Sequence, residues 1–424
     1  MTRASFVMRG DIGYSAGPDR LRTIADGYLV CAEGHSAGAF EALPEAYADW
    51  PMLDFRGKLI LPGLVDLHMH APQYTYRALG MDRELIDWLN TYTFPEEARY
   101  SDLDYARATY GIVAAELRRG PNTRTALFAT AHSQATDVLM RMMDGTGLVS
   151  FVGRVNMDRN APDSLREPDA ATSLEQTREW IERTQSAYKN TKPILTPRFI
   201  PSCSDELMGG LAALQADFAL PIQSHLSENK AEIAWVQQLC PDSDSYTDAY
   251  HRFGMMRGLP TIMAHCVWCD EDEQALIEAS GTFVAHCPQS NINIASGIAP
   301  IRRYLRKGIR VGLGSDVAGG AHPSIFRAMV DAIAVSKLWW RLVDENDEPL
   351  TLAEAFYLGT AGGGEFFGKV GSFAPGYEFD ALVLDDSTIP TVMELTVEDR
   401  LARAVHLSDD RHIVGKIVRG QRLF

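Results

Sequence analysis

The segment LPGLVDLHMH at residues 61–70 is the first of eight apolar segments that decide the fold of this chain. The other seven are TRTALFATAH (123–132), SFVGRVNMD (150–158), KPILTPRF (192–199), LPIQSH (220–225), TIMAHC (261–266), TFVAHC (282–287) and RVGLGSD (310–316). Near-continuous apolar runs are typical of parallel strands that are buried on both faces. The segments between them, such as YARATYGIVAAELRRG (105–120), carry apolar residues at helical spacing. The pattern predicts a (β/α)₈ TIM barrel over residues 61–371.

Both ends of the chain have a different texture, with short apolar patches separated by turns. The N-terminal patches are FVMRGDIGY (6–14), DGYLVCAEG (26–34) and DFRGKLILPG (54–63), and the C-terminal ones are EFDALVLD (378–385) and IVGKIVRGQRLF (413–424). Neither end has enough strands for a stable sheet of its own. We therefore expect residues 1–60 and 372–424 to pair into one small composite β-sandwich domain beside the barrel.

The composition excludes several classes of protein. The 424 residues are 46% hydrophobic and 23% charged, which is ordinary for a globular protein and excludes disorder. The chain has 40 basic and 56 acidic residues, and its net charge of −16 argues against nucleic acid or an anionic membrane as a partner. The start, MTRASFVMRGDIGY, lacks the apolar region of a signal peptide, so we expect a soluble, cytoplasmic protein.

The cysteines do not form a recognisable structural motif. There are six of them, and only Cys266 and Cys269 have C-x-x-C spacing, without the second pair that a structural zinc site needs. We expect reduced thiols, most of them buried.

Histidines and one aspartate follow the predicted strands at the end where a barrel of this kind holds its active site. His68 and His70 end the first strand, and strand alternation points both side chains into the barrel. His225 follows the fifth strand and Asp316 the eighth, which completes three imidazoles and a carboxylate. Such a set suits Zn²⁺ or Fe²⁺ with one position open for water. Polar residues of the core or surface without a metal are the alternative.

Two further residues at the same ends can carry chemistry. Glu228 follows His225 in HLSE and can move protons beside a metal-activated water, or it is simply an acid at the start of a helix. His265 ends the sixth strand and is expected to bind water or substrate; the alternative is a ligand of a second metal. The fourth strand has Arg198 near its end and no lysine there that could be carboxylated to bridge two metals, which favours one metal.

Longer motifs resemble the amidohydrolase superfamily of metal-dependent hydrolases. They are PGLVDLHMH, the continuation HMHAPQYTYRALGMDRELIDWLNTYTFPEEARY, TPRFIPSCSDELM, QSHLSENKAE, MAHC, AHCPQSN and GLGSDVAGG. The likeness extends from about residue 55 to about residue 380 and is fullest to the branch that deaminates guanine. It implies hydrolysis of guanine to xanthine and ammonia by a zinc-activated water, in a homodimer.

The resemblance also implies a role for individual residues. A single zinc would be held by His68, His70, His225 and Asp316. Glu228 would shuttle protons, and Asp316 would help to deprotonate the attacking water. The residues that would recognise the purine are Gln73, Arg198, Phe199 and His265.

The chemistry of these residue types agrees with a purine substrate. Guanidinium donors and an amide complement the donors and acceptors on the edge of guanine, and Phe199 offers a face for stacking. Trp88, in the long segment after the first strand, can close the mouth of the barrel. The alternatives are that Trp88 only packs within that segment and that Arg198 only pairs with a structural carboxylate.

Two rival functions remain open at this point. One is an aminohydrolase of the same superfamily that acts on another purine, a pterin or a chlorotriazine, and differs at Gln73, Arg198 and Phe199. The other is a non-catalytic barrel used as an assembly subunit, which would have lost metal ligands. The other design of zinc deaminase, with H-x-E and P-C-x-x-C motifs, is absent from the sequence.

Overall fold

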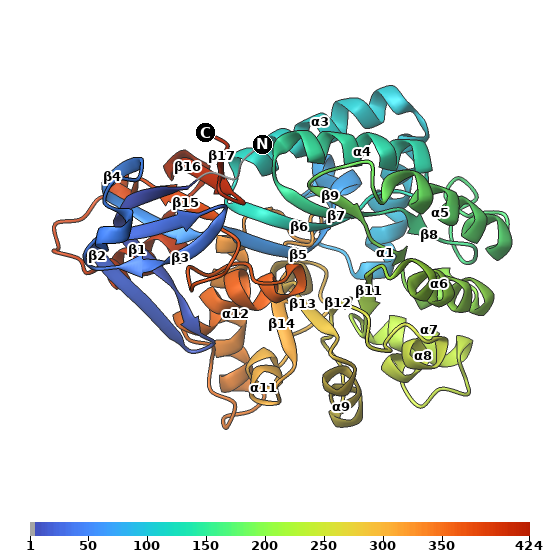
Figure 1. The fold of residues 1–424 in the computed structure, drawn as a ribbon. Coiled ribbons are helices and arrows are strands. Elements are labelled where there is room, and N and C mark those ends of the chain that lie inside the picture. Colours follow the sequence, from blue (N-terminus) through green and yellow to red (C-terminus); the bar gives the residue numbers. More distant parts are fainter. Residues whose placement is uncertain (1–4) are drawn as a thin grey trace.

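A computed structural model describes residues 5–424, so the first four residues of the predicted segment 1–60 lie outside the described residues. A barrel of parallel strands lies beside a seven-stranded sheet (Figure 1). The barrel strands are β5 (Leu64–His70), β6 (Asn122–Phe128), β7 (Val149–Gly153), β9 (Thr191–Pro193), β11 (Ile222–Leu226), β12 (Thr261–His265), β13 (Phe283–His286) and β14 (Arg310–Leu313). Each overlaps one of the eight predicted segments, which confirms the predicted barrel.

The eight strands form two sheets of four that join into a ring. One sheet has the order β5-β6-β7-β9 and the other β11-β12-β13-β14. A parallel bridge between Leu195 and Ile222 joins them on one side, next to the short pair β8 (Val155–Asn156) and β10 (Thr196–Pro197). On the other side the Asp316 amide donates to the His68 carbonyl at 2.8 Å. The ring therefore closes at the end of the barrel that carries the histidines.

Helices follow most strands and surround the barrel (Figure 1). They are α3 (Leu103–Arg119), α4 (Ser133–Thr146), α5 (Ala170–Thr184), α6 (Asp205–Phe218), α7 (Lys230–Leu239), α8 (Tyr246–Phe253), α9 (Glu271–Ser280), α10 (Pro288–Asn293), α11 (Ile301–Arg306), α12 (Ile325–Leu342) and α13 (Leu352–Tyr357). Side-chain caps such as Asp102, Asp169 and Ser204 accept backbone N–H groups and fix the start of several helices. Five short helices lie between β5 and the long helix α3: η2 (Ala71–Tyr76), α1 (Leu85–Trp88), η3 (Leu89–Thr93), α2 (Phe94–Ala98) and η4 (Arg99–Ser101).

The two ends of the chain pair into one composite β domain, as predicted, and its strands form a single seven-stranded sheet. Its order is β17-β16-β15-β4-β1-β2-β3. The N-terminal strands are β1 (Phe6–Gly17), β2 (Arg20–Ala32), β3 (His35–Phe40) and β4 (Met52–Pro62), and the C-terminal ones are β15 (Ala381–Leu384), β16 (Ile413–Val418) and β17 (Gln421–Arg422). β15 joins the halves by pairing with β4. The sheet has its own apolar core, which includes Met8, Phe373 and Phe379. The domain limits themselves stay a prediction.

Two expectations about the whole chain can be compared with the structure. All six cysteines, including Cys266 and Cys269, are buried and none is in a disulfide, as predicted. Within residues 5–424, no helix combines the length and the apolar character that crossing a membrane requires.

A buried ion pair connects the barrel to the terminal sheet. Arg124 on β6 donates from Nε to Asp380 Oδ2 at 2.6 Å and from Nη2 to Glu378 Oε2 at 2.7 Å. Its side chain is 2% exposed and that of Asp380 is fully buried. Asp380 also accepts the Arg419 amide at 2.8 Å. Because both carboxylates come from the segment just before β15, this guanidinium helps to hold the C-terminal strands against the barrel.

We predict that Arg124→Met destabilises the fold strongly, because it leaves the Asp380 carboxylate buried without a counter-charge. Breaking one side of a buried pair costs about 3–5 kcal/mol. The measurement is the midpoint of urea unfolding. Arg107→Met is a matched control, because Arg107 pairs with Asp104 at the surface, where their side chains are 55% and 91% exposed. Equal midpoints for the two variants would contradict this role of Arg124.

Candidate active site

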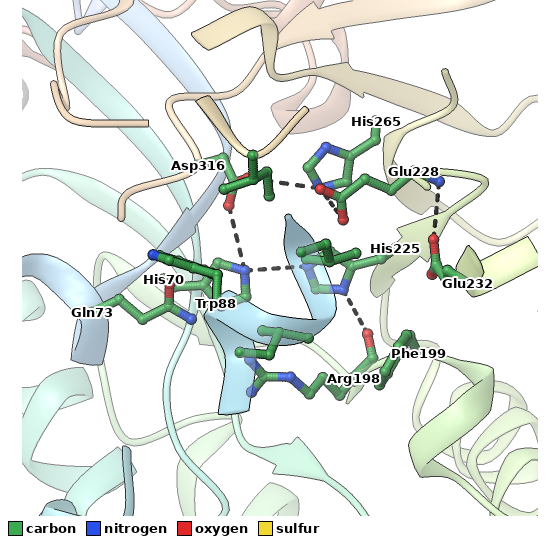
Figure 2. A pocket seen from close by; sticks show the side chains of 13 residues that line it. His70, Gln73, Trp88, Arg198, Phe199, His225, Glu228, Glu232, His265 and Asp316 are labelled. Carbon is green, nitrogen blue, oxygen red and sulfur yellow. Dashed lines mark hydrogen bonds and ion pairs between the residues drawn. The ribbon is translucent and has the colours of Figure 1, made fainter. Parts of the chain in front are cut away.

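A pocket of about 410 Å³, including its opening, lies at the carboxyl ends of the barrel strands. Figure 2 shows the side chains that line it, which come from strands far apart in the sequence. The lining consists of His70, Gln73, Leu85, Trp88, Leu89, Arg198, Phe199, His225, Glu228, Glu232, His265, Ile294 and Asp316. Every predicted site residue lines this pocket except His68, which lies fully buried against His225.

The four predicted ligands lie close together at the base of this pocket: His68, His70 and Asp316 form one group that could hold a metal ion, and His68 and His225 form another with His265. His68 Nε2 and His70 Nε2 lie 3.2 and 3.5 Å from Asp316 Oδ1. His70 Nε2 lies 3.2 Å from His225 Nε2 (Figure 2). His225 is oriented from behind, since its Nδ1 lies 2.6 Å from the Arg198 carbonyl oxygen. That contact places the proton on Nδ1 and leaves Nε2 as an electron-pair donor toward the cluster.

These donors fit a divalent transition metal. Both ring nitrogens of His68 and Nδ1 of His70 are buried without a hydrogen-bond partner among the described residues. Burial and neighbouring imidazoles lower the pKa of His70 and His225 well below the usual value, so both rings are neutral. Burial opposes ionisation of Asp316, but the adjacent histidines outweigh it and lower the pKa of Asp316. Three imidazoles and one carboxylate match the ligand preference of Zn²⁺ and Fe²⁺.

Glu228 lies beside this cluster and is almost fully buried. It accepts a hydrogen bond from Ser296 Oγ on Oε1 at 3.0 Å, and its Oε2 is 3.3 Å from His265 Nε2. Burial, together with the charge of Asp316, raises the pKa of Glu228 to about 8. A carboxyl whose pKa lies near neutrality can both accept and donate a proton.

His265 is held by partners on both ring nitrogens. Nδ1 lies 2.9 Å from Asn291 Oδ1, and Nε2 lies 3.3 Å from Glu228 and 3.7 Å from Asp316. These contacts direct the ring toward the space between the two carboxylates. They agree with a role beside the reacting groups, and the part of His265 in catalysis stays a prediction.

Three strand ends at the site have left-handed backbone. The φ angles are +48° at Ser227, +75° at His265 and +44° at Asp316. Residues other than glycine pay about 1–3 kcal/mol for such conformations, which concentrate at functional sites. Glu232 supports the first of these turns, because its carboxylate accepts the amides of Glu228 and Asn229 in a capping box at the start of α7.

Besides His265, the other predicted substrate-binding residues also line the pocket. Arg198 donates from Nη1 to the buried carboxylate of Glu97 at 2.6 Å, so it both lines the pocket and has a carboxylate partner. Trp88 likewise does both things that the sequence allowed. It lines the pocket, and it packs within its own segment, where its Nε1 donates to the Leu79 carbonyl at 3.0 Å. Phe199 is 6% exposed and Gln73 is 2% exposed.

Comparison with known proteins agrees with this geometry. Residues 59–423 match the model of the amidohydrolase family. The guanine deaminase of Dictyostelium discoideum is 38% identical over 88% of this chain and 84% of its own length. That of Escherichia coli strain K12 is 35% identical over 95% and 92%. A crystal structure of guanine deaminase from C. acetobutylicum with guanine bound in its active site superimposes with a TM-score of 0.96, at 44% identity over 99% and 100%.

The chain belongs to the guanine deaminase branch of the amidohydrolase family. A triazine hydrolase from Arthobacter aurescens has the same fold, with a TM-score of 0.85 at 20% identity. That likeness concerns the fold alone.

Several residues of this amidohydrolase site were not predicted. Glu97, Asn291 and Ser296 contact Arg198, His265 and Glu228 from behind. All three follow strands within loops or short helices, and two of them lie inside quoted motifs, FPEEARY and HCPQSN. The motif strings mark the segments, but no spacing rule separates Glu97 from its neighbour Glu96. Glu232 had a usable signal, because Asn229 and Glu232 form a capping-box pattern.

We predict that the purified protein contains one zinc or iron ion per chain and that Asp316→Ala loses most of it, because the carboxylate is the only anionic donor of the four. Metal analysis after gel filtration is the measurement. His132→Ala is the control, since His132 follows the neighbouring strand β6 away from the four donors. Full metal content in Asp316→Ala would rule out Asp316 as a ligand.

Proposed function

We propose that this protein hydrolyses guanine to xanthine and ammonia, using a single zinc ion held by His68, His70, His225 and Asp316. The observation that carries the proposal is that the four donors lie close together beside a pocket lined by a buried carboxyl and two polar recognition side chains. Membership in the guanine deaminase branch supports guanine as the substrate. Iron in the same site is the alternative metal, because the donor set suits both ions.

The metal would supply Lewis-acid activation of a water molecule, whose pKa falls toward neutrality at such a site. The protein itself supplies the proton path. Asp316 helps to take the proton of the attacking water, and Glu228 carries a proton to ring nitrogen N3 of guanine. Glu228 then helps to protonate the departing amine. A C–O bond forms and the C2–N bond breaks, so guanine and water give xanthine and ammonia.

The remaining lining residues bind and orient the base. Arg198 and Gln73 present hydrogen-bond donors from one side of the pocket, while Phe199 offers an aromatic face (Figure 2). His265 holds its ring beside Glu228 and Asp316, where it can donate to the substrate or to water. Trp88 forms part of the cover, and burial of the base behind it strengthens each polar contact.

The proposal extends to the setting of the enzyme. An uncharged free base meets no repulsion from a surface with net charge −16, whereas a nucleic-acid polymer does. We also propose a cytoplasmic homodimer, on the basis of family resemblance. Light scattering at several protein concentrations measures the dimer directly.

The experiment that tests the proposed function measures ammonia release from guanine, adenine and a pterin and chloride release from a chlorotriazine, each at equal concentration. We expect ammonia from guanine and much slower release, or none, from the others, because Gln73 and Arg198 are arranged for the polar edge of guanine. Faster turnover of another compound would establish the rival aminohydrolase. No turnover of any of them by metal-loaded protein would favour the non-catalytic barrel.

We predict that Glu228→Gln keeps its metal and loses about 10²–10⁴ in turnover, because an amide cannot carry the proton.

Ser296→Ala tests the same carboxyl by changing its pKa without removing it. The Ser296 hydrogen bond favours ionised Glu228 and lowers its pKa, so removing the bond raises the pKa. The acid limb of the kcat/KM profile then moves to higher pH by about one unit.

The two variants have distinct readouts. Near-normal turnover of Glu228→Gln would remove Glu228 from the proton path. An acid limb that stays in place in Ser296→Ala would show that the limb reports another group.

A further inference from the structure

Glu97 lies behind the pocket and binds the two polar residues that face the base. It belongs to α2, its side chain is 1% exposed, and it is not among the lining residues. Glu97 Oε1 accepts from Gln73 Nε2 at 2.8 Å, and Oε2 accepts from Arg198 Nη1 at 2.6 Å. One carboxylate therefore holds both recognition side chains, which come from positions 125 residues apart in the sequence.

The first consequence concerns the direction of the Gln73 amide. Its Oε1 accepts the amide N–H of Ala318 at 3.2 Å, while its Nε2 donates to Glu97. A flipped amide would put its NH₂ group against the Ala318 N–H and its oxygen against the carboxylate, so both contacts would become repulsive. Glu97 and Ala318 thus fix which end of Gln73 is donor and which is acceptor. The second N–H of Nε2 and the second lone pair of Oε1 remain for a ligand.

The second consequence concerns the charge of the pocket. Arg198 is the only arginine or lysine that lines the pocket in the described chain. Its guanidinium and the Glu97 carboxylate are 3% and 1% exposed, so little solvent screens them and their charges cancel. The Cζ atom of Arg198 lies 5.2 Å from the centre of the Phe94 ring. This contact limits movement of the guanidinium away from Glu97.

We infer that Glu97 is a positioning residue that sets the charge selectivity of the pocket: it neutralises Arg198, fixes Gln73, and so favours an uncharged purine over an anionic one. This inference rests on the proposed function, in which Gln73 and Arg198 bind the base. An anion that reaches Arg198 has to give up its hydration and then meets a guanidinium whose charge is already balanced. A neutral base with donors and acceptors on its edge pays much less to enter.

The test compares Glu97→Gln with Glu96→Gln. Both variants remove one negative charge from the same short helix. Glu96 contacts Thr75, Arg99 and Tyr105 and touches neither Gln73 nor Arg198. Two competitive inhibitors of matched shape serve as probes, purine-6-carboxylate and purine-6-carboxamide. Metal content is measured in parallel to show that the ligand cluster is intact.

We expect the wild type and Glu96→Gln to bind the carboxamide more tightly than the carboxylate. In Glu97→Gln the ratio of the two inhibition constants should move about tenfold or more toward the carboxylate, because Arg198 is left without its counter-charge. The KM for guanine should rise about tenfold while kcat falls less, because the change acts on binding through Gln73 and Arg198. A ratio that stays unchanged although the KM rises would overturn the inference and leave Glu97 a structural role.

A second variant separates charge from position and covers poor folding of the first. Glu97→Asp keeps the negative charge but is too short to reach both partners. We expect it to raise the KM for guanine and to retain the wild-type preference for the carboxamide. A preference that shifts toward the carboxylate in Glu97→Asp would contradict the role of charge.

Failure of the proposed function would look different. In that case the wild type would release no ammonia from guanine. Binding of the two probes, measured by calorimetry, would still show whether Glu97 controls the charge of the bound ligand.

Discussion

Asp66 on β5 is fully buried, and its carboxylate faces the segment that follows β14. The site depends on the hydrogen bonds that this carboxylate accepts. They come from the amide of His68 at 3.1 Å, from the amide of Ser315 at 3.0 Å and from the Ser315 hydroxyl at 2.6 Å. Burial raises the pKa of Asp66 to about 7, and these hydrogen bonds oppose the shift. Asp66 therefore closes the ring where His68 and Asp316, 248 positions apart, have to meet.

The chemistry of the site is obtained at the expense of local stability. Imidazole nitrogens are buried without partners, and Ser227, His265 and Asp316 have unfavourable backbone conformations. The regular barrel and the terminal sheet, which Arg124 holds together, supply the stability that maintains this arrangement. A metal at the four donors would satisfy the nitrogens and stabilise the folded state by linkage.

Much of the architecture could be predicted from the sequence because it follows from burial patterns. Parallel strands inside a barrel leave long apolar runs, and a barrel fixes which end of each strand carries the site. His225 and Asp316 were therefore predictable although they lie far apart. Glu97 was not, because Glu96 and Glu97 are adjacent and alike in sequence, and only tertiary packing directs Glu96 to Arg99 and Glu97 to Arg198. The same packing explains why Arg198 both lines the pocket and pairs with the carboxylate of Glu97.

A crystal structure of the metal-loaded protein with a non-hydrolysable guanine analogue tests the central claim most directly. We predict one metal at about 2.0–2.2 Å from a nitrogen of each of His68, His70 and His225 and from an oxygen of Asp316. We also predict the polar edge of the base against Arg198 and Gln73, with Glu228 near N3. A metal held by Glu228 or His265 instead, or a base bound outside this pocket, would contradict the account.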